Sequence, residues 1–300
     1  MFFRNLYLLR LPQPWNLALD SFEAQLARRP FQRCGGSEPT SCGWIAPQPD
    51  GALAHAVGGQ WLVALRVEQR LLPASVIRDE AQDRAATLAE TQGYPVGRKQ
   101  LRELRDRVAE ELLPRAFTRR RTTYAWIDPQ AGWLCIDAAS PAKADELVTH
   151  LRGSLDDLPV TKLHTKVSPV SAMADWLAGG EAPGGFTVDR DCELKAESEE
   201  KSAVRYVRHP LEGEEIRAHL AGGKQPTRLA LTWNDRVSFV LTAEAQVKRV
   251  EFIGIAEDAR EAASERVEEQ FDADFALMTA ELARFLPELV TALGGEKEAN

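Results

Sequence analysis

The sequence predicts an α+β fold in which hairpin-built antiparallel sheets are combined with long helices. Two pairs of apolar runs, each joined by a few turn residues, indicate hairpins. Stretches with apolar residues at steps of three and four lie elsewhere in the chain and indicate helices. With 300 residues and 44% hydrophobic composition, the chain can bury a sizeable core. It has no run of about 18 apolar residues, so we expect no transmembrane helix and no membrane partner.

The N-terminal elements that we expect are a strand over residues 2–11 and a helix over residues 17–27. Pro12 and Pro14 end the strand because proline removes a ladder hydrogen bond. Arg4 and Arg10 interrupt its apolar residues and no small-residue cleavage site follows, so the segment does not read as a signal peptide.

The next region is a loop rich in Gly, Pro and Ser over residues 34–43. Apolar runs at residues 44–45 and 60–67 then flank turn residues at 48–51, which predicts a hairpin or meander. A clearer hairpin signal joins residues 124–128 to residues 133–137. A second one joins residues 229–233 to residues 237–241 through Asn234, Asp235 and Arg236.

Helices are marked by their ends as well as by their periodicity. Ser140-Pro141 and Ser168-Pro169 place an N-cap before a proline at the first helical position. The first helix is expected to end near residue 151 and the second at a glycine pair at residues 179–180. Residues 75–113 predict one or two long helices, with a break near residues 93–97.

The C-terminal region, from residue 257 onward, predicts one long helix or a helix pair with a kink at Pro287. Its apolar residues recur on one stripe. They are Phe271, Phe275, Met278, Leu282, Leu286, Leu289 and Leu293.

The domain organisation that we expect is one unit over residues 1–300, with candidate subdomain breaks near residues 70–75, 179–185 and 195–202. The four cysteines have spacings of neither a disulfide framework nor a zinc site. We therefore expect a reducing, cytoplasmic setting and no cofactor.

Positive charge is concentrated in residues 98–121, which hold nine basic and four acidic residues in a protein of net charge −8. Residues 257–300 run the other way, with twelve acidic and four basic residues. An acidic protein with one strongly basic segment can present that segment to an anionic partner. A solvated helix face is the alternative.

The basic segment predicts an amphipathic helix. Leu101, Leu104, Val108 and Leu112 fall on one stripe. The arginines at 98, 102 and 105 share an arc beside that stripe, whereas acidic residues 103, 106 and 110 lie on another side. Arginine keeps its charge and forms forked hydrogen bonds, so this array suits phosphates. The helix could instead form ion pairs with a partner helix.

Residues 112–119 read LLPRAFTR, and this order resembles the family of recombination-associated proteins called RdgC. The resemblance covers essentially the whole chain and rests on landmarks in the order and spacing of that family. The landmarks are FFRNLYLLRL at residues 2–11, Arg33-Cys-Gly35, Gly43-Trp44, Leu71-Leu-Pro73 with Val76-Ile77, LLPRAFTR, and an ending from Phe271-Asp-Ala-Asp-Phe275 through Leu277-Met-Thr279 to Gly294-Gly-Glu296.

The resemblance implies an elongated subunit that forms a ring-shaped homodimer around duplex DNA, without marked sequence preference. It also implies that the protein restrains RecA-dependent recombination and is nucleoid-associated. The hole of such a ring is lined by basic side chains. The candidate DNA-binding residues are Arg98, Lys99, Arg102, Arg105, Arg115, Arg119, Arg120 and Arg121.

The resemblance further implies a gate-like dimer contact at the phenylalanine of LLPRAF, which is Phe117 with Arg115 beside it. On the other side of this contact the family carries a basic and polar pair. The matching residues are Arg208 and His209, where His209 and the following Pro210 depart from the family pattern. The gate contact can therefore differ in this chain.

We expect no catalytic residue and no metal ligand, and hence no enzyme. Asp272 and Asp274 are two residues apart on a helix and point in different directions, so they cannot share a cation. Residues 221–224 lack the upstream glycine and the Ser/Thr of a phosphate-binding loop. Two alternatives remain, a metal-dependent DNA nuclease and a protein-interaction module that docks an acidic partner.

Overall fold

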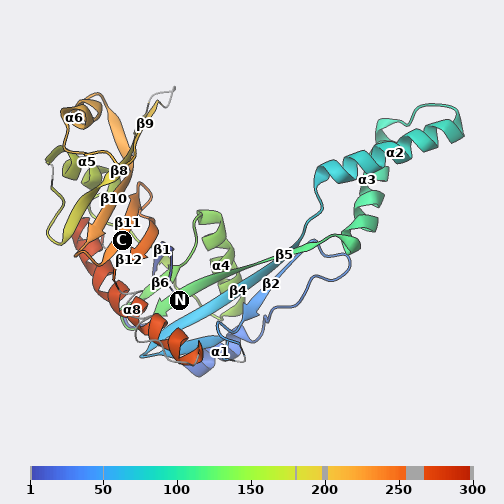
Figure 1. Ribbon diagram of the computed structural model, residues 1–300. Helices are drawn as coiled ribbons and strands as arrows, with labels where there is room; N and C mark the ends of the chain where they lie inside the picture. The colour runs from blue at the N-terminus through green and yellow to red at the C-terminus, as the bar shows by residue number, and fades with distance from the viewer. Residues whose placement is uncertain (1, 50, 180, 198–201, 255–266, 298–300) are drawn as a thin grey trace.

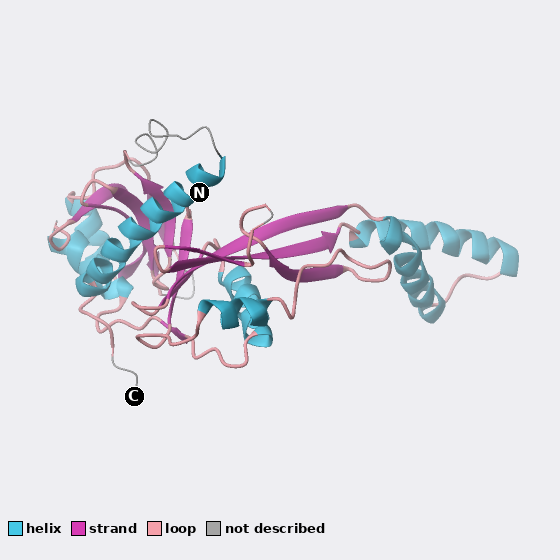
Figure 2. Ribbon diagram, turned by 90° about the horizontal axis from the view of Figure 1, so that it is seen from below, coloured by secondary structure: helices cyan, strands magenta, loops and turns pink. Residues whose placement is uncertain are grey.

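The structure is a computed structural model that describes residues 2–49, 51–179, 181–197, 202–254 and 267–297. Figure 1 shows two limbs that meet at the central strands and leave an open bay between them. One limb contains β8–β12 with α5, α6 and α8, and we call it the body. The other, which we call the arm, contains β2, the distal parts of β4 and β5, and the helices α2 and α3 at its tip (Figures 1 and 2).

Twelve strands of the described residues form one antiparallel sheet in the order β2-β4-β5-β6-β1-β12-β11-β10-β8-β9, with β3 paired to β4 and β7 to β1. The α+β class and its antiparallel hairpins are confirmed. The strands are β1 Asn5–Arg10, β2 Thr40–Ile45, β3 Ala54–Val57, β4 Gln60–Arg70, β5 Thr118–Asp128, β6 Trp133–Ile136, β7 Thr161–Lys162, β8 Phe186–Ala196, β9 Ala203–Tyr206, β10 Lys224–Trp233, β11 Val237–Thr242 and β12 Val247–Phe252.

The helices cover parts of both faces of this sheet. The described helices are α1 Leu19–Leu26, α2 Ala74–Gln92, α3 Arg98–Leu112, η1 Leu113–Arg115 (a 3-10 turn), α4 Pro141–Ser154, α5 Pro169–Gly179, α6 Glu214–Ala221 and α8 Val267–Ala292. The predicted break in residues 93–97 separates α2 from α3, where Gly93 adopts a φ of 78° at the end of α2.

Strand β1 joins the two limbs because it pairs with β12 at its start and with β6 over the rest of its length. Its side chains alternate between two cores. Leu6 and Leu8 belong to the core of the body, and Tyr7 and Leu9 belong to a second core under α1 and α4.

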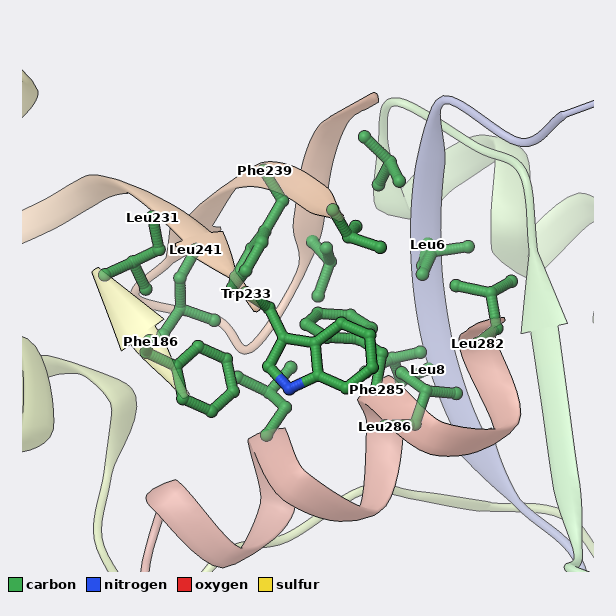
Figure 3. Packing of buried hydrophobic residues seen from close by; sticks show 14 of the residues in the cluster. Leu6, Leu8, Phe186, Leu231, Trp233, Phe239, Leu241, Leu282, Phe285 and Leu286 are labelled. Carbon is green, nitrogen blue, oxygen red and sulfur yellow. The ribbon is translucent and has the colours of Figure 1, made fainter. Parts of the chain in front are cut away.

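The core of the body packs α8 against β8, β10 and β11 (Figure 3). The ring of Phe285 lies 4.9 Å from that of Phe239 and 5.6 Å from that of Trp233, measured between centroids. The indole Nε1 of Trp233 donates to Glu288 at 2.6 Å, which satisfies the polar end of a buried aromatic residue.

The second core contains Phe22, Trp44 and Trp61 on the other face of the sheet. The rings of Phe22 and Trp61 stack with centroids 5.1 Å apart. Trp44 Nε1 donates to the hydroxyl of Ser154 at 2.8 Å, which fastens β2 to α4.

The arm tip is packed much more thinly. Among the described residues of α2 and α3, only Ala81 and Val108 are buried. Arg84 connects the two helices, since its guanidinium contacts Glu80 at 2.8 Å on α2 and Glu111 at 2.7 Å on α3. The hairpin therefore rests on half-exposed side chains and a solvated ion pair.

Several boundaries differ from the sequence predictions. The predicted loop over residues 34–43 is wrong at its end, because β2 begins at Thr40 and pairs with β4. The first strand is shorter than predicted and starts at Asn5, and β5 begins six residues before the predicted hairpin strand. β8, β9, β12 and α6 were not predicted at all.

The C-terminal stripe forms the single helix α8, with Pro287 inside it, over the described residues 267–292. The predicted helical residues 257–266 lie outside the described residues. The candidate subdomain breaks fall between β4 and α2, between α5 and β8, and at the end of β8, where part of the third lies outside the described residues. They stay predictions.

Candidate nucleic-acid interface

One face of the sheet runs continuously from the body to the arm. Residues opposite each other in an antiparallel ladder project their side chains to the same face. Lys248 on β12 lies opposite Asn5 on β1, Tyr7 lies opposite Ile136 on β6, and Ile136 lies opposite Ala125 on β5. Asn5 and Tyr7 are two residues apart on β1 and therefore point to the same face, so Lys248 and Ala125 share that face. Helix α4 covers part of this face and stands in the bay between the limbs (Figure 1), so we call it the inner face.

On the arm, the inner face carries Arg121 and Arg119, which lie two and three pairs of residues beyond Ala125 along β5. Arg121 contacts both carboxylate oxygens of Glu146 on α4, at 2.7 and 2.5 Å. Arg119 is exposed and has no ion pair within the described part of the chain. β6 pairs only with residues 125–128 of β5, so residues 118–123 have no neighbouring strand on that side among the described residues.

Arg120 lies on the opposite face of the same strand. Its Nε donates to Glu68 at 2.7 Å, and Glu68 also accepts the backbone N–H of Cys34 at 2.7 Å. These bonds, first that of Cys34 and then that of Arg120, lower the pKa of the Glu68 carboxyl below its usual range. The three consecutive arginines therefore have three different environments.

The basic residues of α3 lie on the surface of the arm tip. Arg98, Lys99, Arg102 and Arg105 are all exposed. Within the described residues we find no carboxylate paired with them. The leucine stripe beside them is half-exposed and faces α2, with Val108 buried, so the predicted amphipathic helix is confirmed.

The body carries a second basic group that the sequence did not reveal. Lys248 lies opposite Val240 on β11, and Val240 lies opposite Ala230 on β10, two residues from Arg228. Arg228 lies opposite Glu193 on β8, which in turn lies opposite Arg205 on β9. These basic residues are thus on the inner face as well. Together with exposed Arg249 they border a cavity of about 170 Å³. The cavity is lined by Asn5, Asp191, Cys192, Glu193, Arg205, Tyr206, Arg228, Val240, Lys248 and Arg249.

Sequence reasoning missed this group because its members come from different strands and form no run. The available signal was local alternation, since Arg228 precedes buried Leu229 and Lys248 follows buried Val247. Two carboxylates share the cavity, but Glu193 is already held by Lys195 at 2.9 Å and by the hydroxyl of Thr227. Positive charge therefore dominates this part of the inner face.

Acidic residues on β8 do not assemble into a metal site within the described residues, where no group of three or more metal-binding side chains is found. Asp189 accepts the hydroxyl of Thr232 at 2.9 Å, and burial raises the pKa of its carboxyl. On α8, Asp272 contacts His55 at 3.0 Å, whereas Asp274 is bound by Gln270 on the same helix.

The predicted gate residues lie on the two limbs and are not brought together within one chain. Phe117 is 86% exposed at the end of the arm strand β5, and Arg115 beside it is also exposed. In the body, Arg208 has a φ of 53° and donates its backbone N–H to Asp191 at 2.8 Å. His209 lies 3.4 Å from Glu215.

Apolar surface accompanies both halves of the gate. Leu71, 46% exposed, lies next to Phe117, and Val207, 55% exposed, precedes Arg208. Large exposed apolar side chains of this kind mark contacts with another molecule when they cluster. Among the described helices, none combines the length and apolarity needed to cross a membrane.

The fold and this surface define the chain as an open, two-limbed α+β protein with a basic inner face and exposed apolar residues on both limbs. A family model described as "Putative exonuclease, RdgC" matches residues 1–296. The chain belongs to the RdgC family of recombination-associated proteins.

Similar proteins in several bacteria carry the name recombination-associated protein RdgC. That of Dechloromonas aromatica is 62% identical over 299 residues, which cover 99% of this chain and 98% of the relative. Those of Cupriavidus pinatubonensis and Cupriavidus necator are 52% and 50% identical, and in both cases the whole of each chain is covered.

Proposed function

We propose that two copies of this chain close into a ring that binds duplex DNA on its inner faces without marked sequence preference, and that the bound ring restrains RecA-dependent recombination. The observation that carries the proposal is the continuous inner face with basic groups on both limbs. Arg119 and Arg121 stand on the arm, and Arg205, Arg228 and Lys248 stand on the body.

Duplex DNA carries about one negative charge per 1.7 Å of its axis, so cations distributed over a concave surface suffice to bind it. Contacts to phosphates position a protein on DNA but carry no sequence information. The basic residues of the inner face on which the proposal rests lie on strands β5, β9, β10 and β12 and not on a helix. This supports binding to the backbone rather than to base edges.

Two exposed apolar positions support the proposed ring closure. Phe117 on the arm of one copy would contact the region of Val207, Arg208 and His209 on the body of the second copy. Two-fold symmetry then repeats the contact and closes the assembly. A burial of this kind removes an 86% exposed phenylalanine from water.

A closed ring on duplex DNA occupies the surface that a recombination filament must pair with. The proposed restraint of RecA thus needs no enzymatic step and no contact with RecA itself. It would scale with the time that the ring stays on the duplex.

The test is a titration of the purified protein on duplexes of unrelated sequence at increasing salt. If six to eight phosphates are neutralised, the logarithm of the association constant should fall against the logarithm of salt with a slope of about −5 to −7. Closed circular duplex should retain the protein longer than linear duplex, which a ring can leave at its ends. A slope near zero, or strong preference for one sequence, would contradict the proposal.

The description of the matching family model names an exonuclease, which makes nucleolysis the second candidate. Our proposal is that the protein is not an enzyme, and it is supported by the lack of any group of three or more metal-binding side chains among the described residues. Incubation of the protein with end-labelled duplex and Mg²⁺ separates the two candidates. Mg²⁺-dependent loss of label from purified protein would establish the nuclease.

A partner protein with an acidic surface remains the third candidate for the basic helix α3. Competition decides between it and DNA. If random-sequence duplex fails to bind while an acidic polypeptide does, the interaction-module function replaces the proposed one.

A further inference from the structure

Three segments that are far apart in the sequence meet at the end of the arm sheet. They are the loop at Cys34 and Gly35, the end of β4 at Arg70, and the turn that leads from α3 through η1 to Phe117. Two of them, residues 33–35 and 112–119, are landmarks on which the family resemblance rests. A single side chain connects them.

That side chain is the guanidinium of Arg70. Its Nη1 donates to the backbone carbonyls of Pro114 at 3.0 Å and Ala116 at 3.4 Å. Its Nη2 donates to the carbonyls of Gly35 at 3.0 Å and Cys34 at 3.4 Å. One planar fork thus bridges the loop and the turn, an arrangement that a lysine cannot reproduce because its donors radiate from a single nitrogen.

The backbone of the turn is fixed at further points. The N–H of Ala116 donates to Leu113 at 3.2 Å, and the carbonyl of Phe117 accepts the N–H of Leu71 at 2.7 Å. All of these bonds hold main-chain atoms, whereas the side chain of Phe117 is 86% exposed. A large apolar side chain is therefore presented to solvent from a rigid backbone.

A second residue on the same face of β4 also binds the loop. Glu68, two residues before Arg70, is 2% exposed and accepts the N–H of Cys34. Glu68 and Arg70 therefore both bind the loop. The turn is bound through Arg70 to a loop that is itself fixed.

We infer that Arg70 is the positioning residue of the Phe117 contact. It holds the turn at residues 113–117 against the loop at Cys34 and Gly35, so that Phe117 meets its partner surface without having to be ordered first. Preorganisation of this kind strengthens an association because less conformational freedom is lost on binding. The inference rests on the proposed contact between two copies, but the local part of it can be measured without that contact.

The test compares Arg70→Lys with Arg66→Lys in the full chain. Arg66 is the matched control: it lies on the same strand and face, and its guanidinium stacks 5.8 Å over the ring of Phe31. We expect the amides of Ala116 and Leu71 to exchange hydrogen at least tenfold faster in Arg70→Lys, and at the native rate in Arg66→Lys. Thermal melting by circular dichroism confirms that both variants are folded.

The second arm of the test is a double-mutant cycle with Phe117→Ala, read as the dissociation constant for self-association in sedimentation experiments. Arg70→Lys alone should weaken self-association about tenfold, and it should add less than twofold once Phe117 has been removed. Independent, multiplying effects would overturn the inference, as would native exchange rates in Arg70→Lys. If Phe117→Ala leaves self-association unchanged, the proposed contact fails, and the exchange rates alone decide whether Arg70 positions the turn.

Discussion

The two limbs present basic side chains on very different supports. In the body, Arg228 and Lys248 alternate with Leu229 and Val247, which belong to a core covered by α5, α6 and α8. In the arm tip, α3 carries its cations on a helical hairpin in which Ala81 and Val108 alone are buried among the described residues. The body carries its cations on a sheet backed by a core, whereas the arm tip carries them on a thinly packed helical hairpin.

This difference shows how one chain can combine a stable scaffold with an adaptable contact. Arginine and lysine side chains on a solvated helix retain their freedom until phosphates order them. Those on a sheet backed by a core have little backbone freedom left to lose. We expect substitutions in the core of the body to act mainly on stability, and substitutions of exposed basic residues on either limb to act mainly on binding.

The largest effect is expected from Phe285→Ala in the body. Phe285 is fully buried and its ring contacts those of Phe186, Trp233 and Phe239, so its removal should destabilise the protein by about 3–5 kcal/mol. Half-exposed Leu104→Ala in the arm should cost about 1 kcal/mol. Urea denaturation measures both, and equal losses would remove the distinction between the limbs.

Phe117→Ala should have the next largest effect, and it should act on assembly alone. An aromatic anchor at the centre of a contact contributes about 2 kcal/mol or more, which corresponds to roughly a 30-fold weaker self-association. The monomer should keep its stability because the side chain is 86% exposed. Hydrodynamic size and the rate of DNA dissociation are measured together. A variant that stays fully dimeric while losing DNA binding would assign Phe117 to base stacking.

Charge reversal on each limb tests whether the basic residues of both limbs contact the same DNA. Arg98→Glu with Arg102→Glu alters the arm, and Arg228→Glu with Lys248→Glu alters the body. Each pair should reduce affinity by about tenfold or more and make the salt slope shallower by about 2. Filter binding over a salt series gives both values. Should only the arm pair matter, the inner face of the body would lie away from DNA.

Arg78→Glu with Arg107→Glu supplies a matched control for the arm pair. Both residues are exposed on the tip helices, and both lie outside the predicted DNA-binding set. Removal of the same charge from this hairpin should leave the affinity within about threefold of the native value. A full loss would indicate that net charge, and not its placement, drives binding.

The smallest expected effect is a pH dependence of protein stability that arises from one carboxyl group in the arm. The pKa of Glu68 is lowered in the folded protein by the bonds from Cys34 and Arg120, so its contribution to stability is present above the unfolded pKa of about 4.3. It is lost as the pH falls through the lower folded value. The difference in melting temperature between the native chain and Glu68→Gln should therefore shrink below about pH 4. A constant difference would mean that the carboxylate charge contributes nothing.

The sequence predicted those parts of the fold that carry local signals. The turn at residues 234–236 located the β10–β11 hairpin, and Gly93 located the break between α2 and α3. β8 was missed because most of residues 187–195 are polar or charged, which is typical of a loop. Only Cys192 and Leu194 in its second half are buried, and two apolar residues are too few to indicate a strand. The residues of the candidate site, too, were predicted only where the sequence carried a local signal.

The run of arginines in residues 98–121 was visible as composition, but the inner face was not. Arg205, Arg228 and Lys248 are brought together by the pairing of five strands, β9, β8, β10, β11 and β12, and pairing is a property of long-range packing. Conversely, Arg120 was grouped with its neighbours although the strand turns it to the other face, toward Glu68. Whether it contacts DNA stays a prediction.

The alternation of Arg119, Arg120 and Arg121 limits how the arm can change in length during evolution. Loss or gain of one residue in this part of β5 would exchange the two faces, so that Arg120 would enter the bay and the other two would leave it. It would also separate Arg120 from Glu68 and Arg121 from Glu146. Homologous arms can therefore tolerate insertions and deletions of two residues in this strand, whereas a change of one residue requires a compensating bulge.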